Sequence, residues 1–258
     1  MLRVCILGSG SGGNALVVEA RDGLFTTRIL IDDGFNLKQV ERRLQRAALE
    51  FTSLDAIFVT HEHDDHVCGV EACARAYSIP VYCTAGTAQA AQFDVLEVEW
   101  NRIEAGWPVE IGPLRVDPFA VPHDAAEPVQ YAFSDGDRRA AILTDVGECS
   151  ATIVAALSNL HALIIECNHD AAMLRSGSYP PFLKARIGGA RGHLSNAQAA
   201  DILERIDRRR LEWVAAAHLS RSNNRPDLAR ASLHAVLQCD VEAIAVADQD
   251  DGMDWREV

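Results

Sequence analysis

The sequence is constrained most by a dense run of metal-capable side chains that follows an apolar segment. Residues 61–66 read His-x-His-x-Asp-His and come directly after the apolar residues 56–59. Two imidazoles two residues apart can converge on one cation when the backbone is extended, and the next turn can direct Asp65 and His66 toward a second cation. A solvated surface loop has no physical reason to carry three histidines at these spacings. The run therefore predicts a two-metal site at the end of a buried strand.

Three later apolar segments also end in a histidine or an aspartate. The residues that follow them are His123, Asp145 and His218. Ligands in α/β proteins gather at the carboxyl ends of strands, so four strands that end in such residues predict one shared crevice. Each of the three would more often be structural if it stood alone. Together with residues 61–66 they become candidate metal ligands.

The pattern of apolar residues along the chain alternates between short strands and amphipathic helices. It predicts strands at 3–7, 15–19, 28–31, 54–60, 81–84, 95–99, 108–111, 114–121, 129–133, 139–144, 162–166, 213–217 and 241–247. It predicts helices at 37–48, 67–77, 87–93, 151–160, 195–208 and 226–237, with a polar loop before residue 195. No linker or repeat interrupts the pattern, so we expect one α/β domain over residues 1–258.

A glycine-rich stretch near the start matches the dinucleotide-binding pattern GxGxxG through Gly8, Gly10 and Gly13. That fingerprint requires a helix to begin at the glycines, so that its amides meet the pyrophosphate. Here the residues 15–19 predict a strand instead. The stretch is therefore interpreted as a tight turn between two strands, which can still line a site.

Charge and cysteine content narrow the function classes. The 258-residue chain has a formal net charge of −13, which argues against a nucleic-acid partner unless positive charge is concentrated locally. Its seven cysteines form no CxxC pair, which favours reduced thiols. No apolar run is long enough to cross a bilayer and no signal peptide is evident, so we expect a cytoplasmic protein without a membrane partner. The sequence leaves the oligomeric state open.

These motifs resemble those of the metallo-β-lactamase superfamily, and the resemblance spans nearly the whole chain. A narrower resemblance, to the YycJ/WalJ-type branch related to tRNase Z and the β-CASP nucleases, is carried by residues 8–14, 144–147, 166–170, 192–196, 217–220 and 223–226. The resemblance implies an α/β fold of the αββα sandwich type, with a dinuclear metal site at one edge of the sheets. It also implies a hydrolase.

The resemblance further assigns the candidate ligands to two cations. It implies that one cation is held by His61, His63 and His123, and the other by Asp65, His66 and His218, with Asp145 bridging. Imidazole and carboxylate ligands suit zinc or manganese, with iron as a further candidate. Such a pair generates a hydroxide near neutral pH and holds a phosphate oxygen. Asp65 is expected to orient the attacking hydroxide as a catalytic residue.

The second catalytic candidate is His193. The resemblance implies that a histidine at this place protonates the leaving group, as in related RNA-processing enzymes. A competing interpretation is that residues 192–195 only cap a helix, with Ser195 as the N-cap. Neutral donors for substrate are predicted at Ser195, Asn196, Ser220, Asn223 and Asn224. Such residues also commonly form turns. A basic strip is predicted from Lys184, Arg186, Arg191, Arg221 and Arg225. The competing interpretation is that these are ordinary solvated side chains.

Three hypotheses for function follow. The first is a dinuclear-metal phosphodiesterase or nuclease, exonuclease-like, with nucleic acid as its partner. The second is a small-molecule hydrolase of the same fold, acting on a cyclic phosphodiester, lactone or thioester. The third is a metal-binding scaffold without catalysis, against which the complete ligand set argues.

Overall fold

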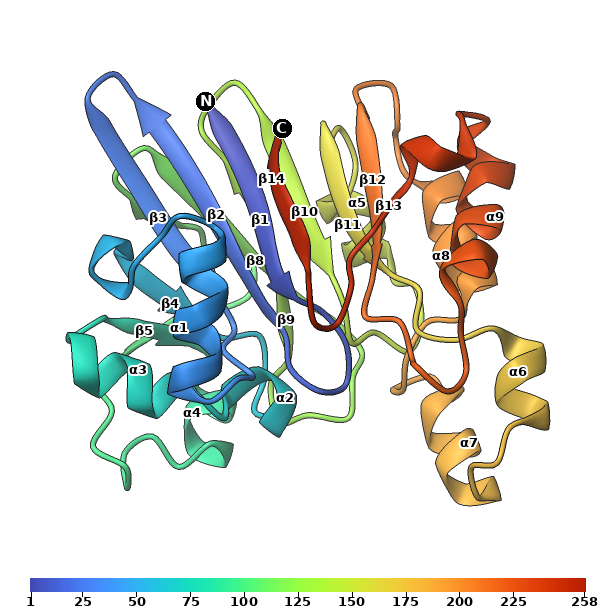
Figure 1. The fold of residues 1–258 in the computed structure, drawn as a ribbon, viewed down its shortest axis with the longest axis horizontal. Helices are drawn as coiled ribbons and strands as arrows, with labels where there is room; N and C mark the ends of the chain where they lie inside the picture. The colour runs from blue at the N-terminus through green and yellow to red at the C-terminus, as the bar shows by residue number, and fades with distance from the viewer.

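The computed structural model describes residues 1–258 and contains two seven-stranded sheets packed face to face, with helices on both outer surfaces (Figure 1). This is the αββα sandwich that the sequence resemblance implied. The strands are β1 (Leu2–Gly8), β2 (Ala15–Asp22), β3 (Phe25–Ile31), β4 (Ala56–Phe58), β5 (Val81–Cys83), β6 (Trp100–Arg102), β7 (Val109–Ile111), β8 (Leu114–Ala120), β9 (Val129–Ser134), β10 (Arg139–Leu143), β11 (Ala162–Glu166), β12 (Trp213–Ala217), β13 (Ala245–Val246) and β14 (Met253–Glu257). The helices are α1 (Leu37–Arg46), α2 (Asp64–Val67), α3 (Val70–Tyr77), α4 (Ala85–Ala90), α5 (Ala151–Ala156), α6 (Ala171–Ser176), α7 (Pro181–Ile187), α8 (Asn196–Arg205) and α9 (Pro226–Leu237).

Both sheets change from antiparallel to parallel pairing partway across. The first has the order β14-β1-β2-β3-β4-β5-β6, and its parallel part begins at the β3–β4 pair. The second has the order β13-β12-β11-β10-β9-β8-β7, and its parallel part begins at the β10–β11 pair. The carboxyl ends of β3, β4, β10, β11 and β12 therefore meet at one edge of the sandwich, where ligands of α/β proteins gather.

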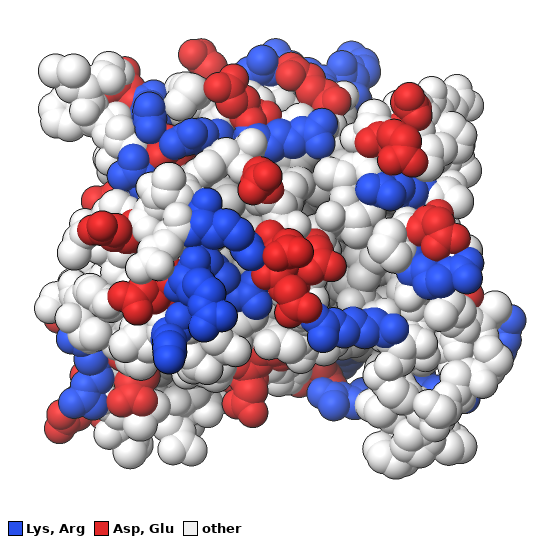
Figure 2. Space-filling view, in the orientation of Figure 1, with Lys and Arg blue, Asp and Glu red and all other residues white.

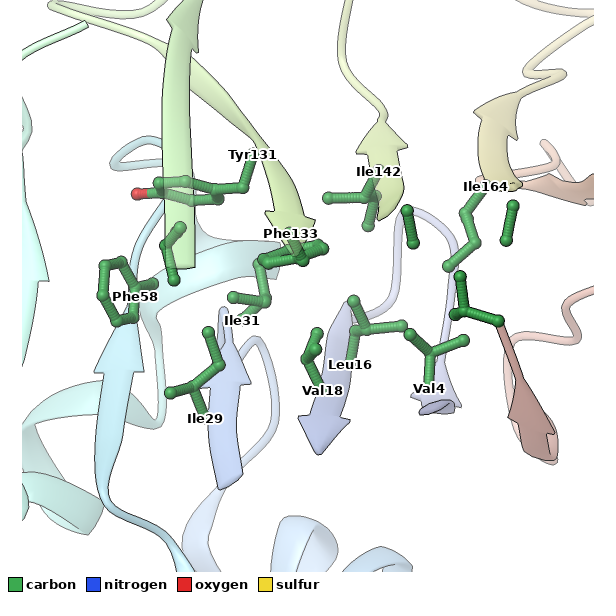
Figure 3. Close-up of a cluster of buried hydrophobic side chains, with 14 of the residues drawn as sticks. Val4, Leu16, Val18, Ile29, Ile31, Phe58, Tyr131, Phe133, Ile142 and Ile164 are labelled. Carbon is green, nitrogen blue, oxygen red and sulfur yellow. The ribbon is translucent and has the colours of Figure 1, made fainter. Parts of the chain in front are cut away.

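Alternating side chains of the two sheets form the central core. In Figure 3 side chains such as Leu16, Ile31 and Phe58 from the first sheet face Tyr131 and Ile142 from the second. The opposite faces of the sheets pack on helices, with α1, α3 and α4 on one side and α5, α8 and α9 on the other. Sheet faces that are apolar on both sides explain why several strands are almost continuously apolar.

Most predicted elements are present within a few residues of their expected limits, and four segments differ, of which one is the unpredicted strand β14. Residues 95–99 are not a strand: the chain turns there, with Gln92 and Glu97 in the left-handed conformation, and β6 follows instead. The predicted polar loop before residue 195 contains α6 and α7. The segment 241–247 forms a short 3₁₀ turn and the two-residue strand β13. The glycine-rich stretch joins two antiparallel strands, as expected, which excludes the dinucleotide fingerprint.

Other expectations concern the chain as a whole. All seven cysteines are free, as their spacing predicted. None of the helices combines the length and the apolar character that a membrane crossing needs.

A buried carboxylate joins the first three strands on the outer face of their sheet. The Glu19 side chain is fully buried and lies 2.7 Å from the Arg3 guanidinium, 2.8 Å from that of Arg21 and 2.6 Å from that of Arg28. Burial favours protonation of Glu19, but the hydrogen bonds from Arg3 and Arg28 outweigh it and lower the pKa. The ionised form is therefore the one that stabilises the folded state.

We expect Glu19→Gln to lower the free energy of unfolding by about 1–3 kcal/mol at pH 7, because charge-assisted hydrogen bonds become neutral ones. A folded-state pKa below the ordinary value of 4.5 gives stability that is complete above that pH. It is lost as the pH falls through the lowered folded-state pKa. Urea unfolding of both proteins at pH 7 and at decreasing pH checks this. A difference that stays constant at acid pH would contradict it.

Candidate metal centre

Strand ends place the candidate ligands at the shared edge. α2, at the lower edge of the sandwich in Figure 1, carries Asp65 and His66 just beyond β4. Three residues within two positions of the ends of β3, β10 and β12 adopt the left-handed conformation: Asp32 (φ 58°), Asp145 (φ 55°) and His218 (φ 54°). Residues other than glycine rarely adopt this conformation, and its strain is typical of functional sites.

The seven candidate ligands come together in overlapping groups. One group contains His61, His63 and His123, and another contains Asp65, His66 and His218. A third joins His61, His66 and Asp145, so Asp145 lies between the first two. Within each group the candidate ligand atoms lie within 4.8 Å of one another. The structure thus brings the seven predicted residues together, and their division between two cations stays a prediction.

Hydrogen bonds fix the orientation of three of these imidazoles. The Nδ1 atom of His66 lies 2.8 Å from Oδ2 of Asp32, that of His123 lies 3.0 Å from the Gly192 carbonyl oxygen, and that of His218 lies 3.1 Å from Oε1 of Glu166. Each Nδ1 donates its hydrogen to these acceptors, which leaves Nε2 of the same ring free as a lone-pair donor. Metal-binding histidines almost always have such a partner.

The cluster also contains buried polar atoms that lack a hydrogen-bond partner. The Asp145 Oδ2 and His218 Nε2 atoms are buried without a hydrogen-bond partner. Burial disfavours charge on His218, yet the carboxylates of Asp145, Asp65 and Glu166 outweigh it and raise its pKa to about 10. The unpartnered carboxylate oxygen of Asp145 and imidazole nitrogen of His218 are atoms of the kind that bind divalent metals, so the residues present fit such ions.

The glycine-rich turn supports this centre. The Asn14 backbone amide donates to the Asp65 carbonyl oxygen at 2.8 Å, and the Asn14 side chain accepts from the amide of Gly10. The Ser9 hydroxyl accepts a hydrogen bond from the His218 amide at 2.9 Å. A Cβ at Gly34 would lie 1.8 Å from the Asp65 carbonyl oxygen, so this approach requires glycine.

His193 lies beside the ligands and is held by a buried carboxylate. Its Nδ1 lies 2.9 Å from Oε1 of Glu166 and 3.5 Å from Oδ1 of Asp145. Burial lowers the pKa of His193, but Glu166 outweighs this and raises it above its usual value. Burial raises the pKa of Glu166, but His193 and His218 outweigh this and lower it to about 2. The contact with Glu166 thus holds the His193 imidazole in one orientation.

A cavity of about 400 Å³ opens over these residues. Its wall includes His63, Asp65, Asp145, His193 and His218 on the metal side. The opposite wall comes from the α6–α7 region, through Tyr179, Leu183, Arg186 and Ile187. The volume lies in the range of small-molecule sites.

The five predicted substrate donors lie near the centre but not among the residues that line the cavity. Ser195 caps α8, as expected, and forms a capping box with Gln198. The side-chain amides of Asn196 and Asn224 bond to each other at 2.8 and 2.9 Å. Ser220 accepts from the amide of Asn223. A role in substrate binding for Ser195, Asn196, Ser220, Asn223 and Asn224 stays a prediction.

The predicted basic strip divides into two parts. Arg221 pairs with Asp250 and Arg225 with Asp227, which makes both ordinary surface ion pairs. Lys184, Arg186 and Arg191 instead lie on or beside the α6–α7 region.

Two carboxylates of the site had no role in the sequence predictions. Asp32 orients His66 and accepts a hydrogen bond from the Thr60 hydroxyl at 2.8 Å. Glu166 orients both His193 and His218. Each stands at the end of an apolar strand, which is the same signal that identified Asp145 and His218.

Comparison with known proteins identifies a family, sequence relatives and solved structures of the same fold. A family model described as "Beta-lactamase superfamily domain" matches residues 27–214. Exodeoxyribonuclease YycJ from Bacillus anthracis is 35% identical over 240 residues, which cover 92% of this chain and 89% of that protein. Exodeoxyribonuclease WalJ from Streptococcus pneumoniae is 34% identical over 256 residues, covering 97% and 91%. The solved structure of the metallo-β-lactamase fold protein YhfI from Bacillus subtilis has a TM-score of 0.75 at 18% identity, covering 100% of this chain and 99% of that one.

Proposed function

The chain belongs to the β-lactamase superfamily and is a metal-dependent hydrolase of that fold, and we propose that it is a nuclease that cleaves DNA phosphodiester bonds at a dinuclear metal centre. The observation that carries the proposal is the pair of His193 with the buried Glu166, beside two groups of metal-type ligands. A phosphodiester needs both charge neutralisation and protonation of its leaving oxygen, and this site offers groups for each.

The ligands divide between two cations in the proposal. His61, His63 and His123 would hold one, and Asp65, His66 and His218 would hold the other, with Asp145 available to either. When bound, such cations would supply a more acidic water and charge neutralisation at the phosphate. Zinc and manganese both suit these ligands.

The remaining steps belong to residues of this chain. Asp65, whose side chain faces the cavity, accepts a hydrogen bond from the attacking water and orients it. A bond forms between the water oxygen and phosphorus as the water releases a proton to solvent, and the bond from phosphorus to the leaving oxygen breaks. His193 gives a proton to that oxygen, while Glu166 holds the imidazole in place.

Removal of the metals should abolish cleavage, and their return should restore it. We expect purified protein to shorten 5′-labelled single- or double-stranded DNA, to lose this activity in chelator, and to regain it with Mn²⁺ or Zn²⁺. RNA of the same sequence and bis-p-nitrophenyl phosphate are assayed in parallel, with metal content measured. The length of the labelled products shows the direction of attack.

Two other results would contradict the proposal. Hydrolysis of the small diester with polymers untouched would identify a small-molecule hydrolase of the same fold. No hydrolysis of either by the metal-loaded protein would favour a binding scaffold.

A further inference from the structure

The region that forms the far wall of the cavity differs in charge from the rest of the chain. Residues 171–200 include four basic residues and no Asp or Glu, although the whole chain has 37 acidic and 24 basic residues. The basic residues are Arg175, Lys184, Arg186 and Arg191. Figure 2 shows the corner over α6 and α7 as mainly uncharged surface with basic groups at its margins. A local excess of positive charge of this kind attracts a polyanion.

Aromatic surface accompanies this charge. α7 has no buried residue, and the Phe182 side chain at its start is 74% exposed. Tyr179, three residues earlier, lines the cavity. A large exposed aromatic group costs free energy in water, and its presence at a functional cleft is typical of an interaction site.

The region is joined directly to the candidate metal centre. The Arg186 guanidinium lies 2.6 Å from Oδ2 of Asp124, which follows the predicted ligand His123. Arg191 donates to the His123 carbonyl oxygen at 3.0 Å. Tyr179 and candidate ligands such as His63 and His218 therefore line one and the same cavity.

We propose that α6 and α7, with the residues that connect them, form a stacking surface for unpaired nucleotides of the strand being cleaved. Tyr179 stacks on the base beside the scissile phosphate, Phe182 stacks on a further base, and Arg175 and Lys184 bind backbone phosphates. Every base has a face that an aromatic ring can cover, so this recognition tolerates any sequence. Bases inside a duplex have both faces covered by their neighbours and are excluded. This inference rests on the proposed nuclease function and adds its substrate class, a single-stranded polynucleotide or a frayed end.

Binding of a short phosphorothioate-linked oligodeoxythymidine, measured by fluorescence anisotropy on the protein as purified, tests the inference without cleavage. We expect Phe182→Ala to weaken binding by about 5- to 100-fold, the effect of losing one stacked base. Phe182→Tyr should bind the oligonucleotide as tightly as the unaltered protein does, whereas Phe182→Leu should bind it as weakly as Phe182→Ala. Phe25→Ala is the matched control, because Phe25 is 77% exposed on the β2–β3 hairpin.

Salt dependence tests the phosphate contacts separately. Each phosphate contact on a single strand contributes about 0.7 to the slope of log K against log salt. Arg175→Gln should lower the slope by about that amount, whereas Arg210→Gln, at an exposed position before β12, should leave it unchanged. A duplex with blunt ends and a duplex with a single-stranded tail complete the series, and Phe182→Ala should weaken binding only of the tailed one.

The outcomes separate this inference from the proposed function. Phe182-dependent binding of the single strand without cleavage would support the stacking surface and contradict the nuclease. If the protein cleaves DNA but Phe182→Ala binds the single strand as tightly as Phe25→Ala does, the stacking surface is overturned. Equal weakening for the blunt duplex would overturn it too, and so would a Phe182-dependent association with lipid vesicles or a second copy of the chain while DNA binding stays constant.

Discussion

His61→Ala is expected to remove bound metal and hydrolytic activity together. His61 is 1% exposed and belongs to two of the candidate ligand groups, so its truncation removes a ligand atom from both. Bound cations contribute several kcal/mol of transition-state stabilisation in such sites, so activity should fall by at least about 10³-fold. Metal analysis by mass spectrometry and a diester hydrolysis assay on the same samples measure both effects.

A second histidine provides the control for His61→Ala. His234 on α9 is half-buried, and its Nδ1 donates to the Cys239 carbonyl oxygen at 2.7 Å, away from the candidate ligands. His234→Ala should retain metal content and turnover. A His61→Ala protein that keeps both its full metal content and its activity would contradict the ligand assignment.

The candidate ligands could be predicted from sequence because strand ends carry a local signal. An apolar run followed by His or Asp can be recognised within a few residues of sequence. The parallel parts of the sheets then bring the ends of these strands together. Asp32 and Glu166 carry the same signal but were missed. Their acceptor roles depend on His66, His193 and His218, which come close only in the folded chain.

The α6–α7 region could not be predicted in the same way. Neither helix reaches eight residues, and α7 has no buried face to produce a periodic apolar pattern. Local capping starts these helices instead. The Asp170 side chain accepts hydrogen bonds from the amides of Ala172 and Met173 at the start of α6, and Pro181 occupies the first turn of α7. Short exposed helices give little periodicity, so sequence patterns describe them as loops.

The error at residues 95–99 has a related cause. Leu96 and Val98 alternate with polar residues as in a half-buried strand, and so short a run matches a turn as well. In the structure Val98 is buried while Val95 is 76% exposed, and left-handed residues at 92 and 97 turn the chain before β6. Positive φ at Gln92 and Glu97 is a tertiary outcome, because neither residue type favours it locally.

His193→Ala is expected to keep the metals and to lower DNA turnover by roughly 10²–10⁴-fold, the contribution typical of a general acid. The variant leaves the candidate ligands and their orienting partners in place, since Glu166 still accepts a hydrogen bond from His218. Metal content should therefore match that of the unaltered protein. Equal metal loss in His193→Ala and His61→Ala would assign His193 to metal binding instead.

The leaving group distinguishes proton donation from other roles of His193. The alkoxide released from DNA requires a proton, whereas p-nitrophenolate leaves without one. His193→Ala should therefore lower hydrolysis of bis-p-nitrophenyl phosphate far less than cleavage of DNA. Glu166→Gln keeps an acceptor 2.9 Å from the imidazole but removes the charge that raises the pKa of His193, so we expect an intermediate loss of roughly 10- to 100-fold on DNA. If His193→Ala slows both substrates equally, His193 positions the phosphate and the proton comes from elsewhere.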